Sequence, residues 1–364
     1  MITIRNIVCQ WSTFLPRFHT KQKADHEVIL DISQHDQLDS LDSLKDRITE
    51  GVFKASPGKR HIPIEVMYQG DGASLYAVYS SSPAYYLYRA ECWILQTYAN
   101  EMASLIADRS SIIELGAGSL EKTQLLLQAV AQAPQIAHGV DYYALDINRE
   151  ALVESLASLP VLKGINCHGL FGTYNDGLRH VAKSLSRSDI EQVPHVFMWL
   201  GSSIGNMSVE DALGMVKTIA DAMVDGDMIL IGLDGWTSTT TIDAAYEPAD
   251  KLVLNTLVNA NEILGQAVFD MSKFVFSTQL NRLEGRNECC CMTTEAIELK
   301  YEDETILMER GEKILVVPSH KYSYDQVIDM VKATGCLEVV RRFGTPDDAE
   351  VHYDVWMWRK TACQ

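Results

Sequence analysis

The stretch Ser111-Ile-Ile-Glu-Leu-Gly-Ala-Gly-Ser-Leu-Glu-Lys-Thr123 decides the fold of this chain. The apolar run 112–115 predicts a short buried strand, and the leucines within 124–133 recur at the spacing of a helix. Between them, Gly116 and Gly118 allow a sharp turn and the close approach of a ligand to the backbone. A strand, a glycine turn and a helix in this order are typical of a site for a nucleotide-type cofactor.

The next predicted strand narrows the kind of cofactor. Val140–Asp146 ends in a carboxylate, at the position where such folds place an acid that binds a ribose. Glu121 occupies the place of the third glycine of a GxGxxG fingerprint, and no GK[ST] is present, which argues against a dinucleotide site and a P-loop. S-adenosylmethionine (SAM) is therefore the favoured cofactor. An ordinary strand-to-helix turn without a ligand stays open as the alternative.

Composition limits the partners. The 364 residues carry a net charge of -18, which opposes nucleic acids and anionic membranes as partners. No apolar run reaches the ~18 residues that a membrane span requires, and the first residues lack the pattern of a signal peptide. We expect a cytoplasmic protein. The eight cysteines show no CxxC spacing, so we expect reduced thiols and no metal site.

Predicted strands and helices alternate after the glycine turn, which is typical of an α/β, doubly wound sheet with helices on both faces. Val193–Leu200 is apolar almost throughout, so we expect it to be a central strand. The other elements predicted here are helices 89–107, 149–159 and 209–223 and strands 165–170 and 228–233. Ligands bind beyond the carboxyl ends of the strands in such sheets. The residues expected to meet there are Gly116, Asp146, Thr173, Tyr174 and Asn206.

The alternation stops after Gly235, which predicts a second lobe inserted into the sheet. The elements predicted in it are helix 242–264 and strands 273–279, 288–294 and 313–317. Helix 322–334 and strands 337–343 and 353–358 are expected to close the sheet, as in SAM-dependent methyltransferases. We expect residues 1–88, which include a helix over 41–50, and 235–320 to form the substrate-binding lobe. Residues 89–234 and 321–364 are expected to form the SAM-binding core.

Three motifs carry a family resemblance. Tyr85-Tyr-Leu-Tyr-Arg-Ala-Glu91 resembles YYPTRxE, residues 114–123 resemble ELGSGxxEKT, and Leu200-Gly-Ser-Ser-Ile-Gly-Asn206 resembles LGSTIGN. These are motifs of the histidine-specific Nα-methyltransferases of ergothioneine biosynthesis and of their relatives that act on tryptophan and dimethylallyltryptophan. The resemblance runs from about Ile64 to the C-terminus. It implies a Rossmann-like, SAM-dependent methyltransferase fold, and the tryptophan branch implies a place in secondary metabolism.

The resemblance also implies which residues hold the cofactor. They are Gly116, Gly118 and Lys122 for the body of SAM, Asp146 for its ribose, Thr173 and Tyr174 for its adenine end, and Tyr68 as the tyrosine that closes over it.

For the substrate, the resemblance assigns Tyr85, Asn206 and Tyr246 to the amine and carboxylate of an amino acid. Tyrosine and asparagine suit this task because they supply both donors and acceptors. Gly201 and Ser319 are further implied substrate contacts.

The residues implied to surround the substrate's side chain, Val317 and Cys289, differ from those of the histidine enzymes; we call these two residues the side-chain wall. Val317 stands where those enzymes carry a glutamate that binds imidazole, and Cys289 stands where they carry a methionine. A buried imidazole N–H without an acceptor costs roughly 1–3 kcal/mol, so histidine is expected to be a poor substrate. An apolar wall suits indole.

We therefore expect a SAM-dependent Nα-methyltransferase of a free aromatic amino acid, L-tryptophan first. The alternatives in the same class are a dimethylallyltryptophan N-methyltransferase, distinguished by pocket volume, and a histidine Nα-methyltransferase. An inactive SAM-binding protein and a methyltransferase of protein or RNA stay open from other classes. The sequence indicates neither the number of methyl groups transferred nor the oligomeric state.

Overall fold

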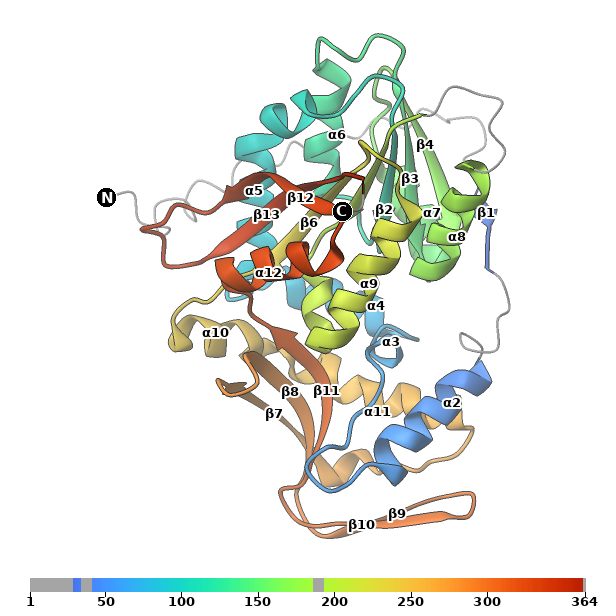
Figure 1. Cartoon of the computed structure of the whole chain (residues 1–364). Helices are drawn as coiled ribbons and strands as arrows, with labels where there is room; N and C mark the ends of the chain where they lie inside the picture. The colour runs from blue at the N-terminus through green and yellow to red at the C-terminus, as the bar shows by residue number, and fades with distance from the viewer. Residues whose placement is uncertain (1–28, 34–40, 186–192, 363–364) are drawn as a thin grey trace.

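The computed structural model describes residues 29–33, 41–185 and 193–362. An eight-stranded sheet forms its upper part (Figure 1), in the order β1-β4-β3-β2-β5-β6-β13-β12. The strands are β1 (Ile29–Asp31), β2 (Ser111–Leu115), β3 (Val140–Asp146), β4 (Ile165–Phe171), β5 (His195–Trp199), β6 (Met228–Asp234), β12 (Leu337–Gly344) and β13 (Tyr353–Lys360). β1 to β6 run parallel, whereas β13 lies antiparallel to both β6 and β12. The predicted doubly wound sheet with a closing antiparallel pair is confirmed.

Helices cover both faces of this sheet because alternate strand residues point to opposite sides. On β2, Ile112 packs in one buried cluster and Ile113 in another. The first cluster includes side chains of α5 (Tyr86–Ser104), α6 (Thr123–Gln132) and α7 (Arg149–Ser158). The second includes α8 (Tyr174–Leu185), α9 (Val209–Ala222) and α12 (Tyr324–Thr334). In Figure 1, α5 and α6 lie on one side of the sheet and α8 and α9 on the other.

A smaller antiparallel sheet occupies the lower part of Figure 1. Its order is β11-β8-β7, with β7 (Phe274–Asn281), β8 (Arg286–Thr293) and β11 (Lys313–His320). A separate hairpin of β9 (Ile297–Tyr301) and β10 (Glu304–Met308) lies at the bottom. The helices of this part are α2 (Leu41–Thr49), α3 (Ile64–Met67), α4 (Gly72–Ser80), α10 (Thr239–Tyr246) and α11 (Asp250–Leu264). Asn259 of α11 donates to the carbonyls of Val66 and Gln69, which fixes α3 on α11.

The prediction of one continuous helix over 242–264 was wrong. A short 3-10 helix, Glu247–Ala249, separates α10 from α11 and contains Pro248, which has no N–H to continue an α-helical ladder. Helix α2 confirms the helix predicted over 41–50, whereas α4 and the β9–β10 hairpin were not predicted. Residues 1–28 and 34–40 of the expected substrate-binding lobe lie outside the described residues.

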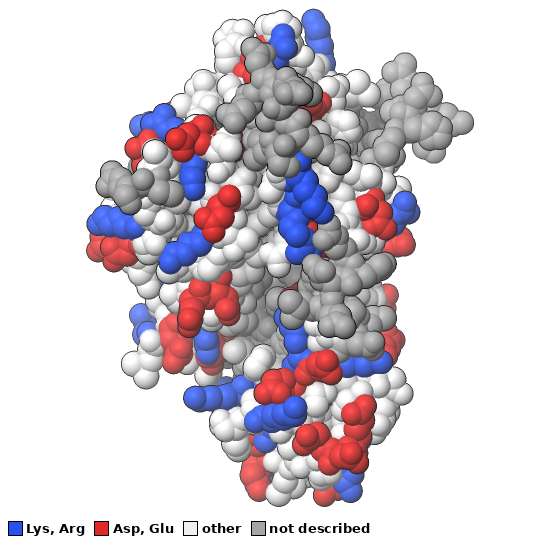
Figure 2. Space-filling model, turned by 45° about the vertical axis from the view of Figure 1, so that its right-hand side comes forward, with Lys and Arg blue, Asp and Glu red and all other residues white. Residues whose placement is uncertain are grey.

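Charge of both signs is present on the surface. The chain has 49 acidic and 31 basic residues, and Figure 2 shows the two kinds interspersed over one face. Within residues 29–33, 41–185 and 193–362, no helix is long and apolar enough to cross a membrane.

Candidate cofactor and substrate site

The glycine turn is tied to the carboxylate that ends β3. The N–H of Gly118 donates to Asp146 Oδ2 (3.1 Å) and the N–H of Asn148 donates to Oδ1 (2.9 Å). The N–H of Gly172, after β4, donates to the carbonyl of Asp146 (3.1 Å). Burial raises the pKa of Asp146, while the backbone N–H groups of Asn148, Gly118 and Ile147 lower it. The segments that follow β2, β3 and β4 therefore meet at this one residue.

Gly116 leaves no room for a side chain. Its φ is +72°, and a Cβ there would lie 2.8 Å from Tyr174 Oη. Tyr174 opens α8 and packs edge-on against Trp199, with ring centroids 5.8 Å apart. Thr173, directly before α8, donates its hydroxyl to Asp176 (2.8 Å) and accepts the N–H of Asp176 (3.2 Å). The Thr173 hydroxyl therefore caps the first turn of α8 through its two hydrogen bonds with Asp176.

Tyr68 lies beside the same strand ends. It follows α3, and its ring packs edge-on against Tyr76 at a centroid distance of 5.5 Å. Burial is the main cause that raises the pKa of its hydroxyl, and the carboxylate of Asp146 adds to the effect. Tyr174 lies beside the glycine turn, since its Oη approaches Gly116, whose N–H donates to the carbonyl of Leu145 next to Asp146 (2.9 Å).

Glu91 joins the three sequence motifs. Its carboxylate is fully buried and forms an ion pair with Lys122 of the glycine turn, whose side chain is 18% exposed. Its Oε1 accepts the N–H of Gly201 (2.8 Å) and the hydroxyl of Tyr353 (2.7 Å). Since Glu91 itself ends the first motif, one carboxylate connects all three. Lys122, predicted to hold SAM, directs its ammonium to this carboxylate.

A second buried network lies between the two sheets. Asp234 ends β6 and Lys321 follows β11, and their side chains form an ion pair (Oδ2 to Nζ, 2.6 Å) with 0% exposure of either. Nζ also donates to Tyr246 Oη (2.7 Å) and Ser319 Oγ (3.0 Å). The hydroxyl of Tyr86 donates to Asp234 (2.9 Å). The network therefore joins α5, β6, α10 and β11 around two predicted substrate residues.

A row of tyrosine rings connects the two regions. The centroids of Tyr68 and Tyr76 are 5.5 Å apart, those of Tyr76 and Tyr79 6.4 Å, those of Tyr79 and Tyr85 4.5 Å, and those of Tyr85 and Tyr246 6.4 Å. Aromatic pairs at these distances stabilise one another. The row leads from the end of β3 to the network around Lys321.

The predicted side-chain wall lies on one face of the smaller sheet. Val317 on β11 is paired with Cys289 on β8, and paired residues of antiparallel strands point to the same face. Ser319, two residues along β11, shares that face and is paired with Asn287. Burial raises the pKa of Cys289 to about 12, which keeps it a thiol. Among the described residues, no group of three or more His, Cys, Asp or Glu lies close enough to hold a metal.

This face is directed toward the tyrosine row. Ser319, on this face, shares a hydrogen bond of 2.5 Å with the hydroxyl of Tyr246, the last tyrosine of that row. The predicted substrate residues that the structure brings into one region are Tyr85, Tyr246, Cys289, Val317 and Ser319.

The loop after β5 contributes two further predicted residues. Gly201 has a φ of +79°, and a Cβ there would lie 3.3 Å from Lys122 Nζ. Asn206 is half-buried and ends the short 3-10 helix Ser203–Asn206. Nδ1 of His320 lies 3.0 Å from the carbonyl oxygen of Gly205, which holds this loop against β11.

Three buried polar residues were not predicted from the sequence. Asp234 and Lys321 carry the ion pair; the signal for Asp234 was a single charge at the end of an apolar strand, whereas Lys321 follows the polar residues Ser319 and His320 and gave no such signal. Asn287 donates to Thr278 Oγ1 (3.0 Å), while its Oδ1 has no hydrogen-bond partner within the described parts of the chain. Nothing in the sequence near Asn287 distinguished it from a sheet residue.

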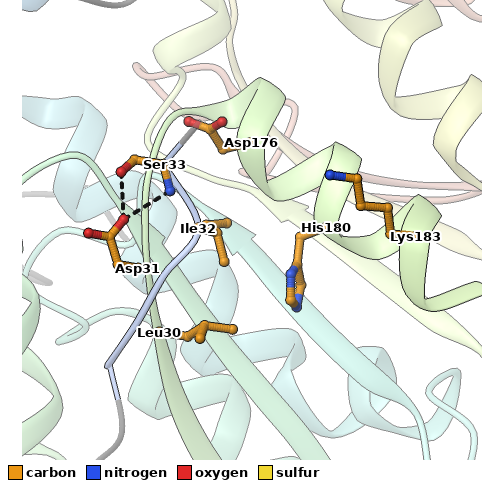
Figure 3. Close-up of a pocket in the computed structure, with 7 residues that line it drawn as sticks. All are labelled: Leu30, Asp31, Ile32, Ser33, Asp176, His180 and Lys183. Carbon is orange, nitrogen blue, oxygen red and sulfur yellow. Dashed lines mark hydrogen bonds between the residues drawn. The ribbon is translucent and has the colours of Figure 1, made fainter. Parts of the chain in front are cut away.

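Figure 3 shows a hollow elsewhere, between the segment Leu30–Ser33 and three side chains of α8, Asp176, His180 and Lys183. Asp31 in this hollow accepts two hydrogen bonds from Ser33. Four strands separate β1 from β6 in the sheet, so the hollow is distinct from the network around Lys321.

Comparison with known proteins gives the family. The sequence profile described as "Histidine-specific methyltransferase, SAM-dependent" matches residues 44–357. "Ergothioneine biosynthesis protein 1" of Neurospora crassa is 38% identical over 62% of this chain, which spans only 26% of that protein. "N-methyltransferase imqF" of Aspergillus flavus is 31% identical over 76% of each chain. "L-tryptophan methyltransferase trpM" of Psilocybe serbica is 28% identical over 85% of this chain and 92% of that one. The chain belongs to the family of histidine-specific, SAM-dependent methyltransferases.

Proposed function

We propose that this protein is a SAM-dependent Nα-methyltransferase of a free aromatic amino acid, with L-tryptophan as the first candidate. The observation that carries the proposal is the pairing of Val317 with Cys289 on the face that also bears Ser319. The wall offers no carboxylate where the histidine enzymes bind imidazole, but it lies beside hydroxyls that suit an amino acid backbone. The name of the Psilocybe relative, an L-tryptophan methyltransferase, supports the same assignment.

The residues around the glycine turn fit the cofactor. Gly116 has a φ of +72°, a conformation that favours glycine, so the backbone of the turn carries no side chain at this point. Asp146 receives two backbone N–H donors and retains acceptor capacity for the hydroxyls of a ribose. We assign SAM to Gly116, Gly118, Lys122, Asp146, Thr173 and Tyr174, with Tyr68 closing over it. Bound there, SAM supplies an activated methyl group.

The task of the other residues is to bind and orient the amine. Tyr85, Asn206 and Tyr246 are assigned to the amine and carboxylate of the substrate. Alignment of the amine for in-line attack and the exclusion of water lower the barrier without a strong base. Burial of the amine in this region also lowers the pKa of the ammonium, which raises the reactive neutral fraction.

A dimethylallyltryptophan substrate is the second candidate. Cys289 is smaller than the methionine at the matching place in the histidine enzymes, which leaves more room against the ring. Relatives named 4-dimethylallyltryptophan N-methyltransferase are 27–28% identical to this chain. We also assign residues 1–88 and 235–320 to a substrate-binding lobe and the remainder to the SAM-binding core.

Kinetics of two anchor variants test the assignment. Asn206→Ala and Tyr246→Phe should each lower kcat/KM for every accepted amino acid, because the backbone that they hold is common to all. Tyr301→Phe is the matched control, since Tyr301 is a buried tyrosine of the β9–β10 hairpin that packs on Phe53. If either anchor variant impaired one amino acid and spared the others, the residue would be reading a side chain instead.

A further inference from the structure

Lys321 is a buried cation that the assignments above leave without a role. Its side chain is 0% exposed, and its ammonium lies 4.8 Å from the centroid of the Tyr246 ring. Burial lowers the pKa of Lys321, but Asp234 and then Tyr246 raise it by more, so the group stays protonated at neutral pH. A fully buried charge is costly unless it is paired and hydrogen-bonded. Lys321 meets both conditions.

The hydrogen bonds of the network can be counted proton by proton. An ammonium has three N–H donors, and those of Lys321 go to Asp234 Oδ2, Tyr246 Oη and Ser319 Oγ. Tyr246 and Ser319 also share one hydrogen bond (2.5 Å), which uses one of their two hydroxyl protons. The other hydroxyl proton has no acceptor within the network. The pair therefore has one O–H to donate outward.

Both sides of this network are held by backbone. The N–H of Lys321 donates to the carbonyl of Gly285 (2.9 Å), and the N–H of Tyr322 donates to the carbonyl of Asp234 (2.8 Å). The N–H of Asp234 in turn donates to Ser202 Oγ (3.0 Å). Donors fixed in this way need no reorganisation when they meet a ligand.

We propose that Lys321 is a positioning residue that keeps the Tyr246–Ser319 hydroxyl pair as a donor toward the carboxylate of the substrate amino acid. The ammonium of Lys321 occupies one lone pair on each hydroxyl oxygen of Tyr246 and Ser319. The hydroxyl proton that is not shared between them is therefore directed away from Lys321, toward the substrate. By pairing with Asp234, the ammonium also prevents an uncompensated negative charge from repelling the substrate carboxylate. The inference rests on the proposed function, because it requires an amino acid at this place. It makes the enzyme selective for amino acids over the corresponding amines.

The test compares tryptophan with tryptamine, which has the same ring and amine but no carboxylate. Both the ratio of their kcat/KM values and the ratio of their Kd values are measured, the latter by calorimetry with S-adenosylhomocysteine present. The wild-type protein should prefer tryptophan by at least about tenfold, the factor that corresponds to a hydrogen bond to a charged group. Equal affinity for the two ligands would overturn the proposal without any variant.

The variant is Lys321→Met/Asp234→Asn, which removes both charges together. Replacing a buried ion pair on both sides preserves folding better than removing one partner. The preference for tryptophan should fall by about tenfold or more while SAM affinity is retained. Lys321→Leu/Asp234→Asn, which is also free of both charges, serves as a second variant if the first does not fold, with the same expected loss of preference.

Lys360→Met is the matched control. Lys360 is also a buried lysine, but its ammonium donates to the carbonyl of Ala220 and to Cys336 on the other side of the sheet. Its loss should leave the ratio of tryptophan to tryptamine unchanged. A folded Lys321 variant that keeps the wild-type ratio would overturn the proposal. A wild-type protein that binds SAM but methylates no amino acid would refute the proposed function itself. This result is distinguishable from a failure of the proposal for Lys321, because it needs no variant.

Discussion

The substitution Glu91→Gln tests whether one buried carboxylate holds the cofactor loop together. A glutamine at this place keeps an acceptor for the N–H of Gly201 and the hydroxyl of Tyr353, because both bond to the same oxygen, Oε1. The amide NH2 of the glutamine then replaces Oε2, the oxygen that faces Lys122. The N–H donors of the amide and of the Lys122 ammonium therefore point at each other. The change therefore removes one charge-assisted hydrogen bond and leaves a cation without its partner.

The magnitude follows from burial. Breaking a fully buried ion pair on one side costs about 3–5 kcal/mol. Lys122 is 18% exposed and can turn partly toward water, so we expect a loss of about 2–4 kcal/mol in the free energy of unfolding. For a chain of 364 residues, the entropy of unfolding is roughly 0.8 kcal/mol/K, so Tm should fall by roughly 3–5 °C.

The assays are calorimetric melting and SAM titration of the same variant. Affinity for SAM should fall along with Tm, because Glu91 positions Gly201 and Lys122. The matched control is Glu101→Gln on the same helix, where Glu101 is 42% exposed and pairs with Arg341. That pair should contribute about 0–1 kcal/mol. Glu91→Gln with wild-type Tm and SAM affinity would refute the reasoning. So would a Glu91→Gln/Lys122→Met variant less stable than the single one, because removal of the second charge should restore stability.

Three further predictions concern the cofactor, the wall and pH. Asp146→Ala should weaken SAM binding by roughly 1.5–3 kcal/mol, the range for a charged hydrogen-bond partner; unchanged affinity in a calorimetric titration would remove Asp146 from the site. Val317→Glu should shift the ratio of kcat/KM toward histidine and lower tryptophan turnover at near-normal SAM affinity; if Val317 only packs in the core, both substrates and Tm should suffer together. Burial raises the pKa of Glu114 to about 7, against the hydrogen bonds from Tyr142 and Thr123 that lower it. Since the folded state then binds this proton more tightly than the unfolded state, the contribution to stability is present below about pH 4.5 and is lost as pH rises to about 7. Urea unfolding at several pH values should show this slope in the wild-type protein, and Glu114→Gln should reduce it.

Local patterns were enough to predict seven of the eight strands of the large sheet, whereas β1 was not predicted. The strands around Gly116 and Asp146 were recognisable because apolar runs, glycine and a terminal acid follow one another within a few residues. The helix predicted over 242–264 failed because helical spacing of apolar residues outweighed the proline at position 248. Helix α4 was missed because its nine residues begin at Gly72 and are rich in tyrosine, a composition that also fits loops.

The buried networks could not be predicted from local patterns. Asp234 and Lys321 are 87 positions apart and meet only because β6 and β11 end at the same place. Glu91 was visible as part of a motif, but its role as the common partner of two other motifs depends on how α5 packs across the strand ends. Such contacts follow from tertiary packing, which periodicity and spacing do not encode.

The most direct test of the central claim is a competition experiment with product masses. The purified protein is incubated with SAM and equal concentrations of L-tryptophan, 4-dimethylallyltryptophan and L-histidine, and the methylated products are resolved by mass spectrometry. We expect methylation at the α-nitrogen, with tryptophan methylated fastest and histidine poorly, and the product masses give the number of methyl groups transferred. Histidine outcompeting tryptophan would contradict the assignment of the wall formed by Val317 and Cys289. The absence of any Nα-methylated product from a protein that binds SAM would contradict the proposed function.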